Sequence, residues 1–345
     1  MARVDRLGAR LDALIAESQF SGVIRVDRAG EKLLERSAGW AHRAHKVPMI
    51  IDTRLAIASG SKGLTALVVL SLAADGSLPL TTRARDLLGD DLQLIDDAVT
   101  VEHLLAHRSG IGDYLDEDAH EIDDYVMEVP VHTLADSTDY LAVLEGHQQR
   151  FVPGERFAYN NAGFVVLAIL VERATRTAFV DLVRQRVCVP ANMKDTEYLR
   201  SDALPERTAL GYLHAQGHDS NVLHLPVRGS GDGGVYTTVA DVHRLWTALR
   251  DGAVLDRAAL AAAWQSRSDV PGEKARYGLG FWLHATGRAV MLEGYDAGVS
   301  FRTVHDPESD TTHTVISNWT NGAWPVTRAL DHDPPRLVTG RIVRT

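Results

Sequence analysis

Residues 53–76 read TRLAIASGSKGLTALVVLSLAADG, a stretch that joins the end of a strand, the start of a helix and two reactive side chains. Its first seven residues have the apolar and β-branched content of a short strand. From Lys62 onward the residues favour a helix, which Gly76 ends in the usual position after the last turn. The sequence therefore predicts that Ser59 lies at the entrance of a helix.

Ser59 and Lys62 are three residues apart, a spacing that stacks their side chains on one helix face with Cβ atoms roughly 5–6 Å apart. A neutral lysine at that distance can take the serine proton, and both burial and the positive field of a helix N-terminus favour the neutral amine. The backbone N–H of Ser59 would face an oxyanion. A capping serine beside a solvated lysine is the alternative. Lysine is scarce in this arginine-dominated chain, which favours the functional interpretation; it occurs at Lys32, Lys46, Lys62, Lys194 and Lys274.

A second group of polar residues, Tyr159-Asn160-Asn161, follows a Pro-Gly-Glu turn and precedes the apolar helix expected over residues 162–173. Tyr159 in such a loop could relay a proton between Ser59, Lys62 and a leaving group. Asn161 could bind a substrate carbonyl or amide. The alternative is a tyrosine packed on the helix, with the asparagines as caps.

Strand patterns occur near both ends of the chain, and helical patterns lie between them. A hairpin is expected over 22–28 and 32–40, and later strands over 276–284, 289–293, 299–305 and 312–318, while residues 81–211 are expected to be mostly helical. This order predicts an α+β protein with an antiparallel sheet flanked by helices and an inserted all-helical domain. The expected boundaries are 1–62 with 216–345 for the sheet domain and 63–215 for the helical domain.

Together these residues resemble the serine β-lactamase and penicillin-binding-protein superfamily, particularly the branch of class C β-lactamases, DD-peptidases and related esterases. Ser-x-x-Lys and Tyr-x-Asn carry the resemblance, supported by HLLAHRSGI (103–111), PGERFAYNNAGF (153–164), VPANMKDT (189–196) and GDGGVYTTVADVHRL (231–245). The resemblance implies a β-lactamase/transpeptidase-like fold. It also implies Ser59 as the acylated nucleophile, Lys62 and Tyr159 as the general base pair and Asn161 as a supporting hydrogen-bond donor.

The sequence departs from this family at the third motif, which lies on a late strand and normally reads Lys-Thr-Gly or His-x-Gly. The matching segment is Tyr295-Asp296-Ala297, followed by Gly298, so the cation is missing and Asp296 adds a negative charge. We expect Tyr295 and Gly298 to bind substrate. The backbone N–H of Gly298 would complete the oxyanion hole with that of Ser59.

Without that cation, recognition of a carboxylate such as that of a β-lactam or a D-Ala-D-Ala peptide is in doubt. Arg302, on the same strand, is a candidate replacement. The run from Asp113 to Glu128 holds eight acids and would repel anions if it covered the cleft, although a solvated acidic loop is equally possible.

The sequence therefore favours a serine hydrolase that forms an acyl-enzyme with an ester or amide of a small molecule, as an esterase or amidase on uncharged or cationic compounds. A β-lactamase, a D-Ala-D-Ala carboxypeptidase or a D-aminopeptidase is the alternative within this chemistry. A binding or sensing protein that is acylated without turnover is the alternative of another class.

Other chemistries find less support in the sequence. It contains no Gly-x-Ser-x-Gly elbow. His103 and His107 have metal-pair spacing but lack the HExxH glutamate, so both are interpreted as structural, and neither a metal nor an organic cofactor is expected. The glycine-rich segment 229–234 lacks the Gly-Lys-Ser/Thr ending of a phosphate loop and suits close backbone packing instead.

Composition also limits the partners. The formal charge of −10 argues against nucleic acid or an anionic membrane and leaves a small ester, amide or peptide as the expected ligand. Residues 1–20 have the pattern of an amphipathic helix, not of a signal peptide, and the apolar run 163–171 is too short to span a bilayer. We therefore expect a cytoplasmic protein. Cys188, the single cysteine, is expected to fill the core.

Overall fold

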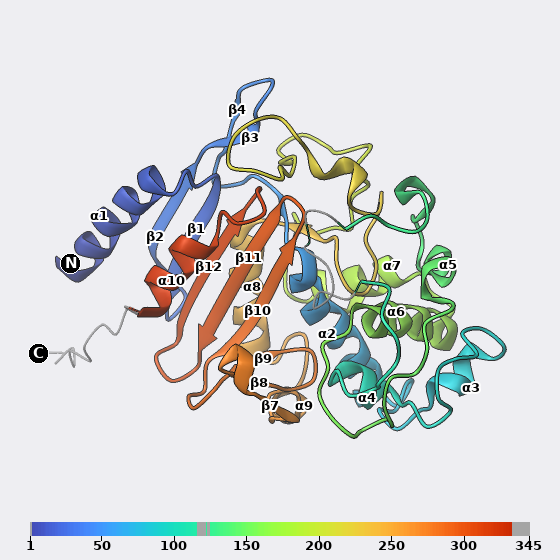
Figure 1. Cartoon of the computed structure of the whole chain (residues 1–345). Helices are drawn as coiled ribbons and strands as arrows, with labels where there is room; N and C mark the ends of the chain where they lie inside the picture. The colour runs from blue at the N-terminus through green and yellow to red at the C-terminus, as the bar shows by residue number, and fades with distance from the viewer. Residues whose placement is uncertain (1, 116–121, 123–124, 333–345) are drawn as a thin grey trace, which may run out of the picture.

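A computed structural model describes residues 2–115, 122 and 125–332 of the chain. Its largest element is an antiparallel sheet in the order β2-β1-β12-β11-β10-β9-β8-β7 (Figure 1). The strands are β1 (Gly22–Arg28), β2 (Glu31–Ala38), β7 (Ser268–Val270), β8 (Ala275–Tyr277), β9 (Trp282–His284), β10 (Val290–Asp296), β11 (Val299–Asp306) and β12 (Thr311–Ser317). β1 pairs with β12 along its whole length, which confirms that the two ends of the chain build one sheet.

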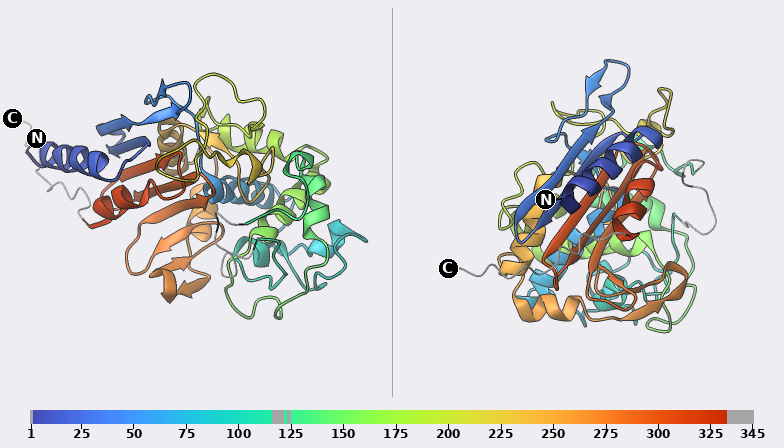
Figure 2. Two further views of the ribbon diagram at one scale, coloured as in Figure 1. Left: turned by 45° about the horizontal axis from the view of Figure 1, so that its top comes forward. Right: turned by 90° about the vertical axis from the view of Figure 1, so that its left-hand side faces the viewer.

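Helices cover both faces of this sheet. α1 (Ala2–Glu17) and α10 (Trp324–His332) pack together on one face, and α8 (Val239–Asp251) packs on the other against β1 and β12 (Figures 1 and 2). α1 buries Leu7 and Leu11, which confirms the amphipathic helix expected near the start of the chain. Within the described ranges, no helix has both the length and the apolarity needed to cross a bilayer.

The other helices lie beside the sheet. The central one is α2 (Ser61–Ala74), which is buried along most of its length and contacts α6 (Asn161–Thr175) and α7 (Phe179–Val183). The shorter helices are α3 (Ala84–Leu88), α4 (Val101–Leu105), α5 (Leu141–Leu144) and α9 (Arg257–Ala263). The expectation of a mostly helical stretch over 81–211 is therefore too strong: turns at left-handed residues such as Gly89 and Gly146 interrupt the helices. The division into two domains stays a prediction.

The single strand expected over 276–284 is instead two strands, β8 and β9, joined by a tight turn. Gly280 has a φ of +80°, which glycine adopts easily, and a Cβ there would lie 2.2 Å from the Ala66 Cβ. The turn thereby packs directly on α2. Its amides are also used, because Leu279 N–H donates to Ala263 O and Gly280 N–H donates to Leu105 O.

Candidate active site

Ser59 lies in a tight turn that a distant part of the chain holds in place. β5 (Leu55–Ala56) pairs with β6 (Tyr236–Thr237), and Ile57 N–H donates to Val235 O. The Ser61 hydroxyl donates to Ala58 O over 2.7 Å and accepts from Val235 N–H over 3.1 Å. Ala58 has a φ of +44°, an uncommon conformation for a residue with a Cβ. The turn η1 (Ala58–Gly60) thus presents a half-buried Ser59 at the start of α2.

Lys62 lies directly behind Ser59 and is only 3% exposed. Its Nζ is 2.8 Å from Ser59 Oγ, 2.7 Å from Asn161 Oδ1 and 2.9 Å from the main-chain oxygen of Asp232. Asn161 Oδ1 and Asp232 O can only accept hydrogen bonds. In the neutral amine these two acceptors therefore take the two N–H groups, and the lone pair is left facing the Ser59 hydroxyl. This arrangement suits proton transfer from Ser59 to Lys62.

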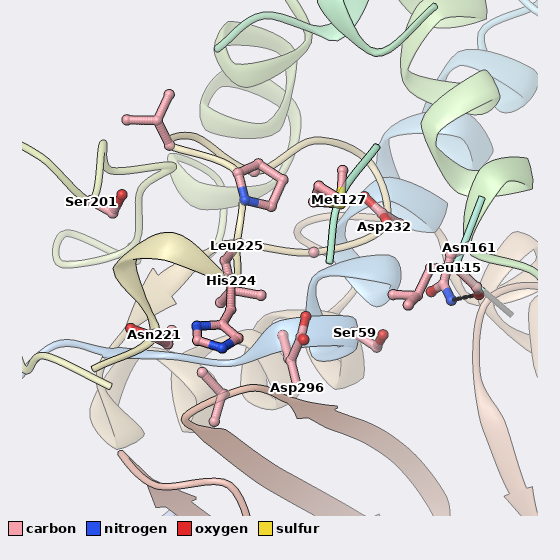
Figure 3. Close-up of a pocket in the computed structure, with 18 of the residues that line it drawn as sticks. Ser59, Leu115, Met127, Asn161, Ser201, Asn221, His224, Leu225, Asp232 and Asp296 are labelled. Carbon is pink, nitrogen blue, oxygen red and sulfur yellow. Dashed lines mark hydrogen bonds between the residues drawn. The ribbon is translucent and has the colours of Figure 1, made fainter. Parts of the chain in front are cut away.

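Two segments far apart in the sequence position these acceptors. Asn161 is the first residue of α6, is buried, and donates from Nδ2 to Leu115 O over 3.0 Å, the bond dashed in Figure 3. Asp232 belongs to the glycine-rich segment 229–234, whose Gly231 would place a Cβ 2.0 Å from Phe164 O. The expectation that these glycines permit close packing is confirmed. The packing brings the Asp232 carbonyl to Lys62.

Tyr159 lies beside the same amine. Lys62 Nζ is 5.0 Å from the centre of the Tyr159 ring, and this ring is stacked at 6.2 Å on Trp282 of β9. The centre of the His107 ring lies 4.4 Å from the centre of the Tyr159 ring. Ser59, Lys62, Tyr159 and Asn161, the four residues that the sequence assigns to the first two motifs, are thus brought together. Their catalytic roles stay predictions.

Asp113 caps the N-terminus of α6, next to Asn161. Its carboxylate accepts from Asn161 N–H over 2.7 Å and from Ala162 N–H over 2.9 Å, at the N-terminus of α6. Burial raises the pKa of the Asp113 carboxyl to about 7, although these backbone hydrogen bonds oppose the shift. The first acid of the run 113–128 is therefore a buried helix cap. Residues 116–121 and 123–124 of that run lie outside the described residues, so the proposed lid is not tested.

The third-motif strand approaches Ser59 at Gly294. A Cβ at this residue would lie 2.0 Å from Ile57 O and 2.9 Å from Gly60 N, so β10 can lie against the turn η1 only because residue 294 is glycine. Tyr295 follows Gly294 directly. Like Ser59, it lines two cavities, an acidic cavity and an aromatic cleft.

Gly298 does not fit the role that the sequence suggests for it. Its N–H donates to Thr320 Oγ1 over 3.0 Å in a buried position, and Gly298 does not line either cavity at Ser59. The assignment of Gly298 to the oxyanion hole is therefore corrected. Its φ of +72° and its contacts with Tyr212 make it a turn residue between β10 and β11.

Arg302 is held away from the cavities at Ser59. Its guanidinium pairs with the carboxylates of Glu293 and Asp331, the latter over 2.6 Å, and Arg302 lines neither cavity. Its charge neutralises Glu293 on the neighbouring strand. The interpretation of Arg302 as a replacement for the missing cation is therefore not supported.

Ser59 lines two cavities. The acidic cavity encloses about 880 Å³ free of atoms, partly open to solvent, and its wall includes Ser59, Tyr114, Asn161, His224, Asp232 and Asp296 (Figure 3). The aromatic cleft has about 1320 Å³ measured in the same way, and its wall includes Ser59, Phe157, Tyr159, Trp282, Tyr295 and Trp324. Both volumes include space that is open to solvent. Ser59 thus lies where the two spaces meet.

Two carboxyl groups, those of Asp232 and Asp296, line the acidic cavity. Its described wall contains no lysine or arginine side chain. Burial raises the pKa of the Asp232 carboxyl, which accepts from Tyr114 Oη. Figure 3 shows the Asp296 carboxylate rising from β10 into the cavity. An anionic group entering here would meet the Asp296 carboxylate, and the described wall offers no lysine or arginine side chain to pair with it.

Sequence reasoning missed three contributors: Asp113, the Asp232 carbonyl and Gly294. The roles of Asp113 and Asp232 depend on contacts between distant segments, so no local pattern signals them. Gly294 did carry a signal, because a glycine inside a predicted strand often marks a close backbone approach.

Comparison with known proteins agrees with this geometry. The family model described as Beta-lactamase matches residues 7–333. The chain is 28% identical over 326 residues to penicillin-binding protein 4* of Bacillus subtilis, covering 89% of this chain and 70% of that protein. It is 31% identical over 313 residues to esterase EstB of Burkholderia gladioli, covering 80% of this chain and 78% of the esterase.

A solved structure gives the same result for the fold. The penicillin-binding protein from Bacillus halodurans superimposes with a TM-score of 0.87 at 32% identity, covering 93% of this chain and 99% of that one. The β-lactamase/transpeptidase-like fold expected from the sequence is confirmed. With the family model matching nearly the whole chain, the protein belongs to the β-lactamase family of serine hydrolases.

Proposed function

We propose that this protein hydrolyses an ester or amide of a small uncharged or amine-bearing molecule through an acyl-enzyme on Ser59. One observation carries the proposal. Lys62 Nζ is 2.8 Å from Ser59 Oγ, and the same amine donates hydrogen bonds to two atoms that can only accept, Asn161 Oδ1 and Asp232 O. A capping serine beside a solvated lysine would show neither this burial nor these partners.

The reaction proceeds in two balanced steps. Ser59 Oγ forms a bond to the acyl carbon as its proton passes to Lys62; the bond to the leaving group then breaks, and that group takes the proton by way of Tyr159. Water next attacks the acyl carbon by the same route in reverse, which releases the acid and restores Ser59. The backbone N–H of Ser59 and the main chain at Gly294–Tyr295, which lies against the serine turn, stabilise the oxyanion.

The charge of the acidic cavity supports the choice of substrate. Asp296 lines this cavity at the third motif, where the expected cation is missing, and Arg302 is paired with Glu293 and Asp331. A carboxylate bound at this position would lack a partner, whereas a neutral group or an ammonium would not. The similarity to an esterase supports the same choice over a β-lactamase.

The test compares wild type, Ser59→Ala and Ser61→Ala on p-nitrophenyl acetate, p-nitrophenyl butyrate, D-alanine p-nitroanilide and a chromogenic cephalosporin. We expect the wild type to turn over the esters, or the amine-bearing anilide, far more efficiently than the cephalosporin. Ser59→Ala should abolish turnover. Ser61→Ala should lower turnover without abolishing it, since the Ser61 hydroxyl holds the turn through two hydrogen bonds but is not the proposed nucleophile. Preferred turnover of the cephalosporin would overturn the substrate choice, and a stoichiometric burst without turnover would indicate an acylated binding protein.

A further inference from the structure

Two aromatic pairs line the aromatic cleft beside Ser59. In one pair the rings of Tyr159 and Trp282 are stacked, with centroids 6.2 Å apart and an interplanar angle of 13°. In the other pair Tyr295 of β10 packs against Trp324 of α10, with centroids 5.8 Å apart. All four side chains are half-buried, so each keeps part of its ring surface exposed to the cleft. Such surfaces suit contact with the flat ring of a ligand.

The charges around the cleft are nearly balanced. Arg156 and Glu273 are exposed at its edge, and Glu293 is neutralised by Arg302. An aromatic group without charge would therefore enter without leaving an unpaired ion behind. The described wall of the acidic cavity, in contrast, carries the carboxyl groups of Asp232 and Asp296.

The positions of the catalytic candidates separate the two spaces by role. Tyr159 lines the aromatic cleft and is absent from the described wall of the acidic cavity, while Asn161 lines only the acidic cavity. A group that protonates the leaving group must stand on the side where that group departs. If Tyr159 delivers this proton, the leaving group departs through the aromatic cleft and the acyl part occupies the acidic cavity.

We propose that the aromatic cleft binds an aryl leaving group, so that the preferred substrates are aryl esters or anilides. This inference rests on the proposed function of Ser59. In the acylation step the Ser59 Oγ–acyl bond forms and the bond from the acyl carbon to the aryl oxygen or nitrogen breaks. The proton from Ser59 ends on the departing phenol or aniline.

The kinetic test compares phenyl acetate with hexafluoroisopropyl acetate, whose leaving group is acidic but not aromatic. Trp324→Leu removes one aromatic ring from the wall of the cleft, and Trp40→Leu is the control, because Trp40 is an exposed tryptophan on β3 (Trp40–His42) that lines neither cavity. We expect Trp324→Leu to raise KM for phenyl acetate about 3- to 10-fold, the range of one aromatic contact. KM for hexafluoroisopropyl acetate and both KM values of Trp40→Leu should stay unchanged. Equal changes for both esters, or none, would overturn the proposal.

A binding experiment keeps the proposal testable even if neither ester is turned over. Saturation-transfer NMR on Ser59→Ala protein should detect 4-nitrophenol but not cyclohexanol, and the Trp324→Leu substitution added to that variant should weaken the signal. If wild type binds 4-nitrophenol but turns over no ester, the proposed aryl-binding cleft stands and the proposed hydrolase activity is wrong. If wild type turns over the esters but the NMR signal shows no preference for 4-nitrophenol over cyclohexanol, the hydrolase activity stands and the aryl-binding cleft is wrong.

A separate set of contacts concerns His107, a residue that the sequence suggests is structural. Its carbonyl accepts from Ala158 N–H over 2.9 Å, and its ring Nδ1 accepts from Asn160 N–H over 3.1 Å. These are the residues on either side of Tyr159, whose own ring lies 4.4 Å from the imidazole. His107 thus fixes the backbone before and after Tyr159 and supports its ring. From these contacts we infer that His107 is a positioning residue for Tyr159.

This role requires the neutral imidazole. Because Nδ1 accepts a hydrogen bond, the hydrogen must be on Nε2. Burial, and after it the charge of Lys62, hold the pKa of His107 well below its usual value. The other rings packed on the imidazole are those of Phe157, Phe164 and Tyr277. Burial raises the pKa of Tyr277, so its phenol stays protonated. None of these ring contacts therefore places an acid against the imidazole.

The test compares His107→Asn with His107→Leu. Asparagine can place Oδ1 near the Nδ1 position and tolerates the left-handed backbone at this residue, where φ is +53°. We expect His107→Leu to lower kcat about 10- to 100-fold at nearly constant KM, because one buried hydrogen bond is lost and Tyr159 is displaced. His107→Asn should keep most of the wild-type kcat. Crystal structures of both variants give a readout without turnover: Tyr159 should move in His107→Leu only. Equal losses in both variants, or an unmoved Tyr159, would overturn the inference.

Discussion

The Nζ of Lys62 lies 2.8 Å from the Oγ of Ser59, with its remaining hydrogen-bonding positions occupied by two oxygens that can only accept. The lone pair of a neutral Lys62 is therefore directed at the serine before any substrate arrives. Such preorganisation reduces the reorganisation needed during proton transfer.

Changing Asn161 tests this arrangement, because its Oδ1 is one of the two acceptors. Asn161→Leu should lower kcat/KM roughly 10- to 100-fold through loss of a buried hydrogen bond. Asn161→Asp keeps the acceptor but adds a negative charge that favours the ammonium form, so the acid limb of the kcat/KM profile should move to higher pH. Asn192→Asp, at an exposed residue, is the control for added charge. A profile that does not move in Asn161→Asp would argue against Lys62 as the base.

Gly294→Ala tests the contact between β10 and the serine turn. The new Cβ would lie 2.0 Å from Ile57 O, so strand and turn must separate. We expect kcat to fall about 100- to 1000-fold, the usual effect of losing an oxyanion donor, with a smaller effect on KM. Gly272→Ala, where a Cβ meets nothing within 4 Å, should leave kcat unchanged. Retained activity in Gly294→Ala would remove β10 from the mechanism.

Replacing Asp296 tests the selection against anions. Asp296→Asn should lower KM for benzylpenicillin about 5-fold, corresponding to about 1 kcal/mol for one charge at short range in water. KM for an uncharged ester should hardly change. Asp269→Asn, an exposed acid on β7, is the control and should affect neither substrate. Equal KM values for benzylpenicillin in Asp296→Asn and wild type would show that Asp296 does not set the preference.

Asp113 should make the stability of the protein depend on pH. Burial raises the pKa of its carboxyl from 3.8 to about 7, so between these values the folded protein keeps a proton that the unfolded chain releases. The contribution of Asp113 to the free energy of unfolding should therefore decrease as pH rises from about 4 to about 7, by at most about 1.4 kcal/mol per pH unit, and level off above. Urea unfolding of wild type and Asp113→Asn across this range measures the difference. A difference that is constant with pH, or one that grows in favour of wild type, would contradict the raised pKa.

The sequence was sufficient for the parts of the site that depend on local spacing. Ser59 and Lys62 face each other because three residues separate them at a helix start, and Asn161 reaches Lys62 because it begins the next buried helix. The union of both chain ends in one sheet was likewise visible in the strand patterns, and β1–β12 pairing confirms it.

The remaining parts depend on which segments meet in space. The Asp232 carbonyl reaches Lys62 because the glycines around it pack against α6. The sequence near residue 232 predicts close packing but does not identify α6 as the partner. Family spacing suggested Gly298 for the oxyanion hole, yet the backbone comes closest to the serine turn at Gly294, and Gly298 donates to Thr320. The choice between the two glycines follows from the packing of β10 against η1, which spacing does not encode.

The most direct test of the central claim is to trap the acyl-enzyme. Wild type, Ser59→Ala and Ser61→Ala are mixed with p-nitrophenyl acetate or the D-alanine anilide, quenched in acid early in the reaction, digested and examined by mass spectrometry. The acyl group should be found on Ser59 in wild type and in Ser61→Ala, and on no residue in Ser59→Ala. An acyl group on another residue, or one that persists in Ser59→Ala, would contradict Ser59 as the nucleophile.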